Sequence, residues 1–125
     1  MKCGRAGFTL IELLVVMVLI SLLLSIAIPT YFGHVDQARE TVLRQDLAQL
    51  RDAIDKYAGD YGHYPDTLEE MVARRYIRKV PVDPITERAD SWQLVAPESK
   101  KQGKVFDVRS GAQGKARDGS DYASW

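Results

Sequence analysis

A run of apolar residues near the start of this chain limits what it can fold into. From Phe8 to Ile28 the only charged residue is Glu12, and the only other polar residues are Thr9, Ser21 and Ser25. A helix of roughly 20 residues crosses the hydrocarbon core of a bilayer. The run is therefore predicted to be a transmembrane helix.

The residues on either side of this run indicate how it is processed. A cleavable secretory signal has small residues after its apolar core, but here the run continues into Pro29 without an A-x-A pattern. The small residue stands ahead of the run instead, because Gly7 closes a short leader that contains Lys2 and Arg5. Positive charges ahead of a first span keep that end in the cytoplasm. The rest of the chain is therefore expected on the outer side of the membrane.

The start of the run also resembles a known signal. The stretch Arg5-Ala-Gly-Phe-Thr-Leu-Ile-Glu-Leu-Leu-Val-Val is similar to the class III signal of type IV pilins and type II secretion pseudopilins. The resemblance implies that a membrane-embedded prepilin peptidase cuts between Gly7 and Phe8, and that the new amino group of Phe8 is methylated. It also implies that Glu12, at the fifth mature position, pairs with the Phe8 amine of a neighbouring subunit in a growing filament.

The free-energy cost of placing the Glu12 carboxylate in a membrane helix points to the same partner. A carboxylate in the apolar part of a membrane helix costs about 2.5 to 3.5 kcal/mol on insertion scales, and such residues usually have a partner. The only positive charge that the run can supply is the amino group of Phe8 created by cleavage. The alternative is that Glu12 lies near the membrane interface and is simply hydrated.

The stem is expected to continue beyond the membrane as an amphipathic helix. Pro29 removes an amide donor and predicts a break in the helix. After this break, apolar residues recur at alternating spacings of four and three, which places them on one helical face that packs against the chain's own globular domain. These residues are Leu43, Leu47, Leu50, Ile54, Tyr57 and Tyr61.

The headgroup is predicted to contain a short helix and two strands. Gly59 and the following turn residues are expected to end the stem helix. Asp66 or Thr67 can cap a short helix that runs to about Arg75. Alternating apolar and polar residues predict strands at 91–95 and 104–108. Asp83-Pro84 resembles the pseudopilin pattern, but the aromatic residue and glycine turn that usually follow are absent, which suggests a divergent branch.

The glycine-rich segment 110–125 is the second place where chemistry is expected. Calcium takes six to eight oxygen ligands, and Ser110, Gln113, Asp118 and Asp121 supply side-chain oxygens here. The resemblance implies a calcium site, because the major pseudopilins carry one in this loop. Gln113 stands where their loop commonly has an aspartate, so one charged ligand is missing. An ion-free glycine-rich turn remains the alternative.

Cysteine, histidine and charge content exclude several other classes of function. Cys3 is the only cysteine and lies in the leader, so the mature chain has no disulfide, unlike many type IV major pilins. His34 and His63 have no Cys or acid at metal-ligand spacing, and no nucleophile motif is present, so no enzymatic activity is expected. The 17 Lys and Arg residues balance 17 Asp and Glu residues, which gives no case for a nucleic-acid surface.

Together these features predict an α+β, type IV pilin-like fold. A long N-terminal helix, transmembrane in its first half and amphipathic in its second, packs on a small antiparallel β-sheet headgroup. The expected segments are a cleaved leader (1–7), a transmembrane and filament-core helix (8–28), the amphipathic half of the stem (29–58) and the headgroup with its C-terminal Gly/Asp loop (59–125).

The function that the resemblance implies is that of a pseudopilus subunit. Such a subunit is a single-pass protein of the bacterial inner membrane, with its N-terminus cytoplasmic and its headgroup periplasmic. It polymerises into a helical homo-oligomer with the help of prepilin peptidase, other pseudopilins and an inner-membrane assembly platform, and it drives protein export by type II secretion. The alternatives are a type IV pilin or minor pilin for adhesion, motility or DNA uptake, and a membrane-anchored envelope binding protein that does not polymerise.

Overall fold

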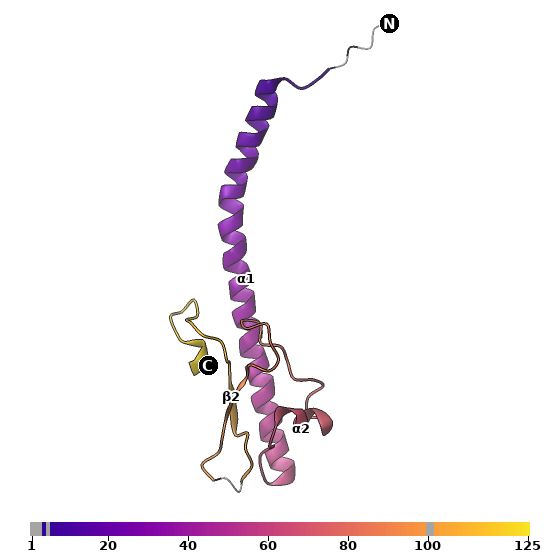
Figure 1. Ribbon diagram of the computed structural model, residues 1–125, viewed down its shortest axis with the longest axis vertical. Helices are drawn as coiled ribbons and strands as arrows, with labels where there is room; N and C mark the ends of the chain where they lie inside the picture. Colours follow the sequence, from indigo (N-terminus) through magenta and orange to yellow (C-terminus); the bar gives the residue numbers. More distant parts are fainter. Residues whose placement is uncertain (1–3, 5, 100–101) are drawn as a thin grey trace. The chain divides into compact units, whose positions relative to one another are not determined.

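A computed structural model describes residues 4, 6–99 and 102–125 of the chain. Its elements, in chain order, are α1 (Leu10–Tyr61), α2 (Leu68–Ala73), β1 (Gln93–Val95), β2 (Asp107–Arg109) and the short 3₁₀ helix η2 (Tyr122–Ser124) (Figure 1). The chain divides into two units, Met1–Asp36 and Gln37–Trp125, and α1 contributes to both. The long helix and the two-stranded antiparallel sheet confirm the predicted pilin-like α+β fold.

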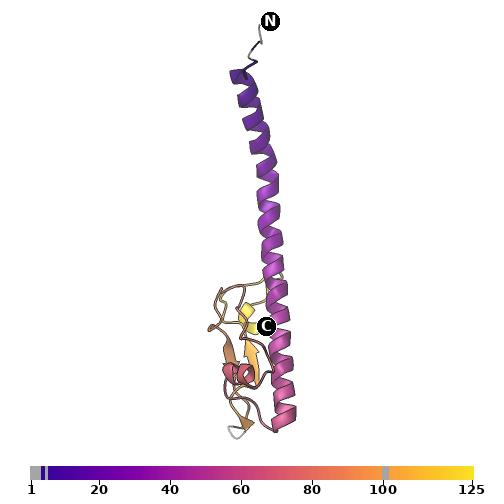
Figure 2. The ribbon, with the colours of Figure 1, turned by 90° about the vertical axis from the view of Figure 1, so that its right-hand side faces the viewer.

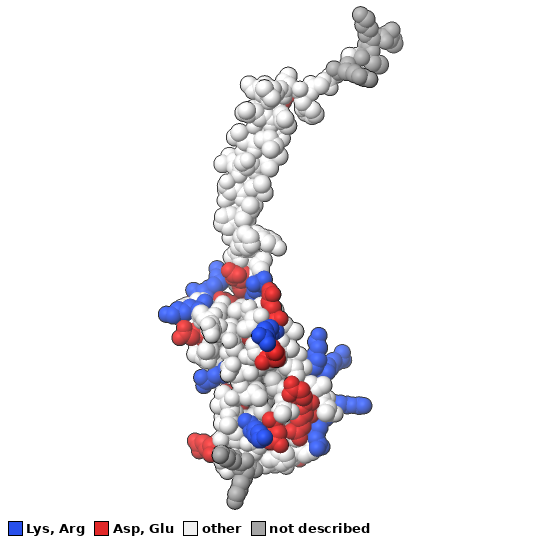
Figure 3. Space-filling view, in the orientation of Figure 1, with Lys and Arg blue, Asp and Glu red and all other residues white. Residues whose placement is uncertain are grey.

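The first unit contains the apolar part of α1. Its large apolar side chains between Leu10 and Ile28 are all between 46% and 83% exposed. Within the described residues, α1 is the helix that is long and apolar enough to cross a membrane. The visible face of this part of the helix carries almost no charged side chains (Figure 3). An apolar surface of this extent indicates contact with lipid or with other protein, and it fits a single-pass membrane anchor.

The predicted break at Pro29 does not appear, because α1 continues through this residue to Tyr61. Proline lacks an amide donor and costs about 3 kcal/mol inside a helix. The turns on either side nevertheless keep their helical conformation. Two side-chain hydroxyls near Pro29 also bond to carbonyls of the same helix. Ser25 donates to the Ser21 carbonyl at 2.8 Å, and Thr30 donates to the Ile26 carbonyl at 3.1 Å.

The end of α1 lies later than predicted. Gly59 is inside the helix, and α1 ends at Tyr61. The residue that allows the chain to leave the helix is Gly62, whose φ is +74° and whose amide donates to the Ala58 carbonyl at 2.9 Å. A glycine in the left-handed region just after the last helical residue is a common helix terminator. The sequence offered two glycines at this turn, and the second one ends the helix.

The core of the second unit lies against one side of the C-terminal half of α1 (Figure 2). The predicted apolar stripe is confirmed except for Tyr61, which is 41% exposed. Burial of such a stripe, rather than helix propensity, supplies most of the stability of a helix in a globular domain. The buried cluster consists of Leu43, Leu47, Leu50, Ala53, Ile54, Tyr57, Leu68, Met71, Trp92, Val105 and Val108.

The strands are shorter than predicted. β1 and β2 pair antiparallel, with Leu94 opposite Val108. The predicted second strand began at Lys104, but the amides of Lys104 and Val105 donate to the Pro65 carbonyl, at 3.3 and 2.9 Å. Because these donors bond to the turn after α1, they do not extend the ladder with β1. The chain there joins the sheet to the end of the stem helix.

Candidate functional site

The predicted cleavage site lies in the chain just ahead of α1. Gly7 and Phe8 are outside regular secondary structure, and α1 begins two residues after Phe8, at Leu10. Gly7 is exposed, and the Phe8 side chain is 89% exposed. A peptide bond in irregular, exposed chain is accessible to a peptidase. Cys3 lies outside the described residues.

Glu12 takes part in a reciprocal cap at the start of α1. Its Oε2 accepts a hydrogen bond from the Thr9 amide at 3.0 Å, and the Thr9 hydroxyl accepts one from the Glu12 amide at 3.2 Å. This is a capping box, which satisfies two amides that a helix start otherwise leaves without partners. The capping role of Thr9 was not predicted, although the spacing Thr-x-x-Glu ahead of an apolar run is the signature of a capping box.

The Ser110 hydroxyl is buried and bonds to Asp83, which lies outside the C-terminal loop. Ser110 is fully buried, and its hydroxyl donates to Asp83 Oδ2 at 2.5 Å while it accepts from the Ala112 amide at 3.1 Å. Asp83 is also fully buried, and its Oδ1 accepts from the amides of Ile85 and Thr86 at 2.8 and 3.3 Å. This buried network ties the segment after α2 to the segment after β2. The Asp83-Pro84 pattern was noted in the sequence, but its role as a buried acceptor was not.

The Asp118 carboxylate is already bonded within the protein. Its Oδ1 accepts from the amide and the hydroxyl of Ser120 at 2.9 and 2.5 Å, and its Oδ2 lies 3.3 Å from Arg44 Nη2. The Ser120 hydrogen bonds, with a further contribution from the charge of Arg44, lower the pKa of the Asp118 carboxyl. Asp121 precedes η2 and forms a β-bridge with Lys115, whereas Gln113 is exposed.

These four predicted ligands do not fit calcium in this arrangement. The Ser110 hydroxyl bonds to Asp83, and the Asp118 carboxylate pairs with the Arg44 guanidinium. Two of the four predicted calcium ligands are therefore already bonded to other groups of the protein. Among the described residues, no group of three or more His, Cys, Asp or Glu side chains could hold a metal ion. Calcium requires six to eight oxygens. The ion-free turn, the alternative in the sequence analysis, agrees better with these contacts.

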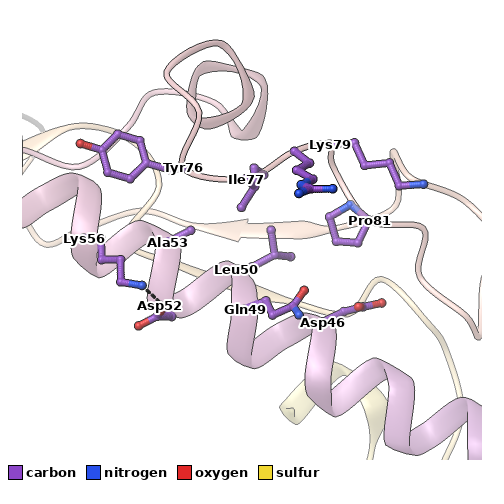
Figure 4. Close-up of a pocket in the computed structure, with 11 residues that line it drawn as sticks. Asp46, Gln49, Leu50, Asp52, Ala53, Lys56, Tyr76, Ile77, Lys79 and Pro81 are labelled. Atoms are coloured by element: carbon purple, nitrogen blue, oxygen red, sulfur yellow. Dashed lines mark ion pairs between the residues drawn. The ribbon is translucent and has the colours of Figure 1, made fainter.

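A groove of about 480 Å³ lies between α1 and the segment Tyr76–Pro81 (Figure 4). Its α1 side carries the ion pair of Lys56 with Asp52, at 2.8 Å, and its other side carries Tyr76, Ile77 and basic residues. Burial, followed by the nearby charge of Asp83, raises the pKa of Asp46 at one end of the groove. The described residues that line it include no Ser, Cys or His. The groove therefore lacks the usual nucleophile and base of an acyl-transfer site.

Comparison with known proteins covers nearly the whole chain. Residues 2–28 match the family model described as the prokaryotic N-terminal methylation motif. Type II secretion system core protein G of Pseudomonas aeruginosa is 30% identical over 138 positions, which cover 97% of this chain and 95% of that protein. The proteins of the same name from Klebsiella pneumoniae and Escherichia coli are 31% and 30% identical, with 97% of this chain and 94% and 91% of theirs covered.

This chain belongs to the type II secretion system core protein G family. The resemblance seen at the N-terminal signal is thus confirmed over stem and head alike. The alignments with the core protein G relatives run over 137 or 138 positions, more than the 125 residues here, so these relatives contain residues that this family member lacks. No solved structure matches the chain.

Proposed function

We propose that this protein is the structural subunit of a periplasmic pseudopilus that drives protein export in type II secretion. Prepilin peptidase cuts between Gly7 and Phe8, and the amino group of Phe8 is methylated. The segment 8–28 then anchors the subunit in the inner membrane and later forms the filament core. The amphipathic segment 29–58 leads into the headgroup, 59–125, which lies in the periplasm. The subunit is structural and has no catalytic turnover.

The observation that carries this proposal is the combination of the methylation motif at residues 2–28 with likeness to core protein G over nearly the full chain. The exposed apolar surface of α1 supports it, because such a surface needs lipid before assembly and neighbouring helices after assembly. The absence of any charge from Leu13 to Ile28 suits both environments. Other pseudopilins and an inner-membrane assembly platform are the further partners that we propose.

Glu12 has two roles in this proposal. In the single chain it caps its own helix through Thr9. During assembly its charge attracts the Phe8 amine of a neighbouring subunit, and this attraction selects the register of the incoming helix. A capping box accepts Glu or Gln at this position, whereas only Glu carries a charge. The two roles can therefore be separated by substitution.

The test replaces Glu12 by Gln and by Ala in a strain that depends on this subunit. Glu12→Gln keeps the cap but removes the charge, and Glu12→Ala removes both. We expect both variants to enter the membrane and to be cleaved, as judged by the size of the product on an immunoblot, but to assemble no filament and to leave the exported proteins inside the cell. Thr9→Ala, which removes the hydroxyl of the cap and keeps the charge, is the matched control and should still support secretion.

The outcomes also distinguish the alternatives. Normal secretion by the Glu12→Gln strain would contradict the role of the charge in assembly. Loss of surface pili with secretion intact would indicate a type IV pilin. Intact secretion and intact pili in a strain that lacks the protein altogether would indicate an envelope protein that does not polymerise.

A further inference from the structure

Four side chains of α1 bind the C-terminal segment, residues 110–125. They are Gln37, Glu40, Arg44 and Arg51, which are separated by three, four and seven residues and therefore lie along one face of the helix. This polar row runs beside the buried apolar stripe that includes Leu43, Leu47 and Leu50. The C-terminal segment has little secondary structure of its own, since its only helix is the three-residue η2. Its position therefore depends on side-chain contacts.

Arg44 makes the central contact of this row. Its Nη2 lies 3.3 Å from Asp118 Oδ2, and its guanidinium carbon lies 4.0 Å from the centre of the Trp125 ring. A guanidinium is a planar cation that can pair with a carboxylate and stack on an aromatic face at the same time. Arg44 thus joins two parts of the C-terminal segment that are seven residues apart.

Arg51 and Glu40 hold the segment on either side of Arg44. Arg51 donates to the Trp125 carbonyl at 2.6 Å and to the Val108 carbonyl at 3.0 Å, and its Nε pairs with Asp107 at 2.8 Å. Glu40 Oε1 accepts from the Arg117 amide at 2.9 Å and from the Tyr122 hydroxyl at 3.0 Å. Both the loop and the end of the segment are therefore bonded directly to the stem helix.

The segment is also closed by contacts of its own. Trp125 Nε1 donates to the Ser120 hydroxyl at 2.7 Å, and that hydroxyl donates to Asp118 Oδ1 at 2.5 Å. The rings of Tyr122 and Trp125 meet edge to face, with their centres 5.2 Å apart. Asp118 thus accepts from Ser120 on one oxygen and faces Arg44 with the other. A metal ion at Asp118 would have to displace one of these contacts.

We propose that Arg44 is the built-in cation of this loop. It neutralises Asp118 and ties the loop to α1, the two tasks that a bound calcium ion would perform there, so the headgroup holds its C-terminal segment without a metal. The stability of the headgroup then depends on ionic strength, because salt screens an exposed ion pair, and it does not depend on calcium. This proposal concerns the headgroup alone and holds whether or not the subunit forms a filament.

The test is thermal unfolding of the mature full-length chain in detergent, followed by tryptophan fluorescence. Each sample is melted with a chelator and with calcium at about 10 mM, roughly ten times the weakest dissociation constants of protein calcium sites. The variants are Arg44→Met, which keeps an unbranched side chain but removes the charge, and Asp118→Asn. Lys56→Met is the matched control, because it removes a cation of the same helix that pairs at 2.8 Å with the exposed Asp52.

We expect the melting temperature of the unmodified chain to be the same with chelator and with calcium, and to fall as salt is added. Arg44→Met should lower it by several degrees, clearly more than Lys56→Met does. Arg44→Met and Asp118→Asn together should lower it by less than the sum of the two, since both remove one contact. Trypsin should also cut faster after Lys115 or Arg117 in Arg44→Met than in the control.

Two results would overturn the proposal. A melting temperature that rises with calcium and falls with chelator would show that the loop binds the ion after all, as the sequence predicted. Equal effects of Arg44→Met and Lys56→Met on melting and on trypsin cleavage would show that Arg44 is an ordinary surface cation. If Arg44→Met fails to fold, the calcium and salt responses of the unmodified chain and of Asp118→Asn still decide between these cases.

Discussion

The two ends of α1 belong to one helix but are stabilised in different ways. Between Leu10 and Ile28 every large apolar side chain is at least 46% exposed, whereas the five apolar residues of the later stripe from Leu43 to Tyr57 are at most 2% exposed. The side-chain hydrogen bonds described for the first part stay within α1 and its N-cap, and its apolar side chains are left exposed. The second part is held by the headgroup that packs on it. The same substitution should therefore destabilise the headgroup when it is made in the second part and leave headgroup stability unchanged when it is made in the first.

The largest contrast is expected for leucine to alanine. Leu47→Ala leaves a cavity in the headgroup core, and such substitutions cost about 2 to 5 kcal/mol. Leu19→Ala, on the 53% exposed Leu19 side chain, should leave the unfolding of the headgroup unchanged. Chemical denaturation of the full chain in detergent, followed by tryptophan fluorescence, measures both. Both tryptophans, Trp92 and Trp125, lie in the second unit, so the signal reports on the headgroup. A similar loss in the two variants would mean that the apolar stem is part of the same cooperative unit.

A smaller contrast is expected for serine to alanine. Ser110→Ala leaves the fully buried Asp83 Oδ2 without its hydroxyl donor, and a buried polar group left without a partner costs about 1 to 3 kcal/mol. Ser25→Ala removes a bond that runs only to the Ser21 carbonyl of the same helix. The same denaturation experiment should show a loss for Ser110→Ala alone. An unchanged midpoint for Ser110→Ala would show that Asp83 finds another donor, such as water.

Replacing tyrosine by phenylalanine should change headgroup stability, and its dependence on pH, only in the second part of α1. Tyr57 is fully buried and its hydroxyl donates to Glu70 Oε1 at 2.6 Å. Burial, that hydrogen bond and the charge of Glu70 raise the pKa of Tyr57 to about 12, and the bonds from Tyr57 and from the Asp66 amide lower the pKa of Glu70. Tyr57→Phe should therefore cost about 1.5 to 3 kcal/mol near neutral pH, the range for a hydrogen bond to a charged group. Tyr31→Phe, at a 66% exposed position, should cost the headgroup nothing.

The sign of the pH dependence follows from the two shifts. The raised pKa of Tyr57 stabilises the folded state below the unfolded value of 10.0, and this contribution is lost as the pH rises from there to about 12. The lowered pKa of Glu70 stabilises the folded state above the unfolded value of 4.5, and this contribution is lost as the pH falls below it. Tyr57→Phe should thus remove the contribution of Tyr57 to the alkaline loss of stability and weaken the acid loss, while Tyr76, whose hydrogen bond to Asp60 also raises its pKa to about 12, keeps its own alkaline contribution. Identical pH profiles of the two proteins would contradict this assignment.

The sequence predicted what depends on local pattern. The apolar run and the four-three spacing of Leu43, Leu47, Leu50 and Ile54 predicted the helix and its buried face, because helical periodicity is a local property. The helix was predicted to end at Gly59 but ends at Tyr61, because Gly62, and not Gly59, takes the left-handed conformation. The helix also continued through Pro29, where a break was predicted.

Contacts between distant segments could not be predicted from the sequence. Val105 bonds to the Pro65 carbonyl rather than to β1, and nothing near Val105 in the sequence indicates that partner. Ser110 was predicted as a ligand by its oxygen and its glycine-rich surroundings, but its actual partner, Asp83, is 27 residues away. Arg44 lies 74 residues from Asp118. Processing at Gly7 and Phe8, the assembly role of Glu12 and calcium binding stay predictions.

The smallest difference in stability is expected between the N-caps of α1 and α2, which have the same four-residue pattern. Thr9-x-x-Glu12 begins α1, and Thr67-x-x-Glu70 begins α2, where the Thr67 hydroxyl accepts from the Glu70 amide at 3.1 Å and Glu70 Oε2 accepts from the Asp66 amide at 2.9 Å. Thr67→Ala should cost the headgroup about 1 kcal/mol, the usual value of an N-cap, and Thr67→Ser should restore most of it.

Thr9→Ala should leave headgroup stability unchanged and act only on the first turn of α1, because Leu10 and Ile11 in the turn it caps are 83% and 69% exposed. Amide hydrogen exchange at Glu12 and at Glu70 separates the two effects, since each amide donates to the threonine of its own cap. Exchange at Glu12 should speed up in Thr9→Ala with no change at Glu70. In Thr67→Ala, exchange at Glu70 should speed up together with that of core amides such as Leu50, because α2 unfolds with the headgroup. Core amides that keep their rates in Thr67→Ala would place α2 outside that cooperative unit, and the packed half of the molecule would then be smaller than its buried cluster indicates.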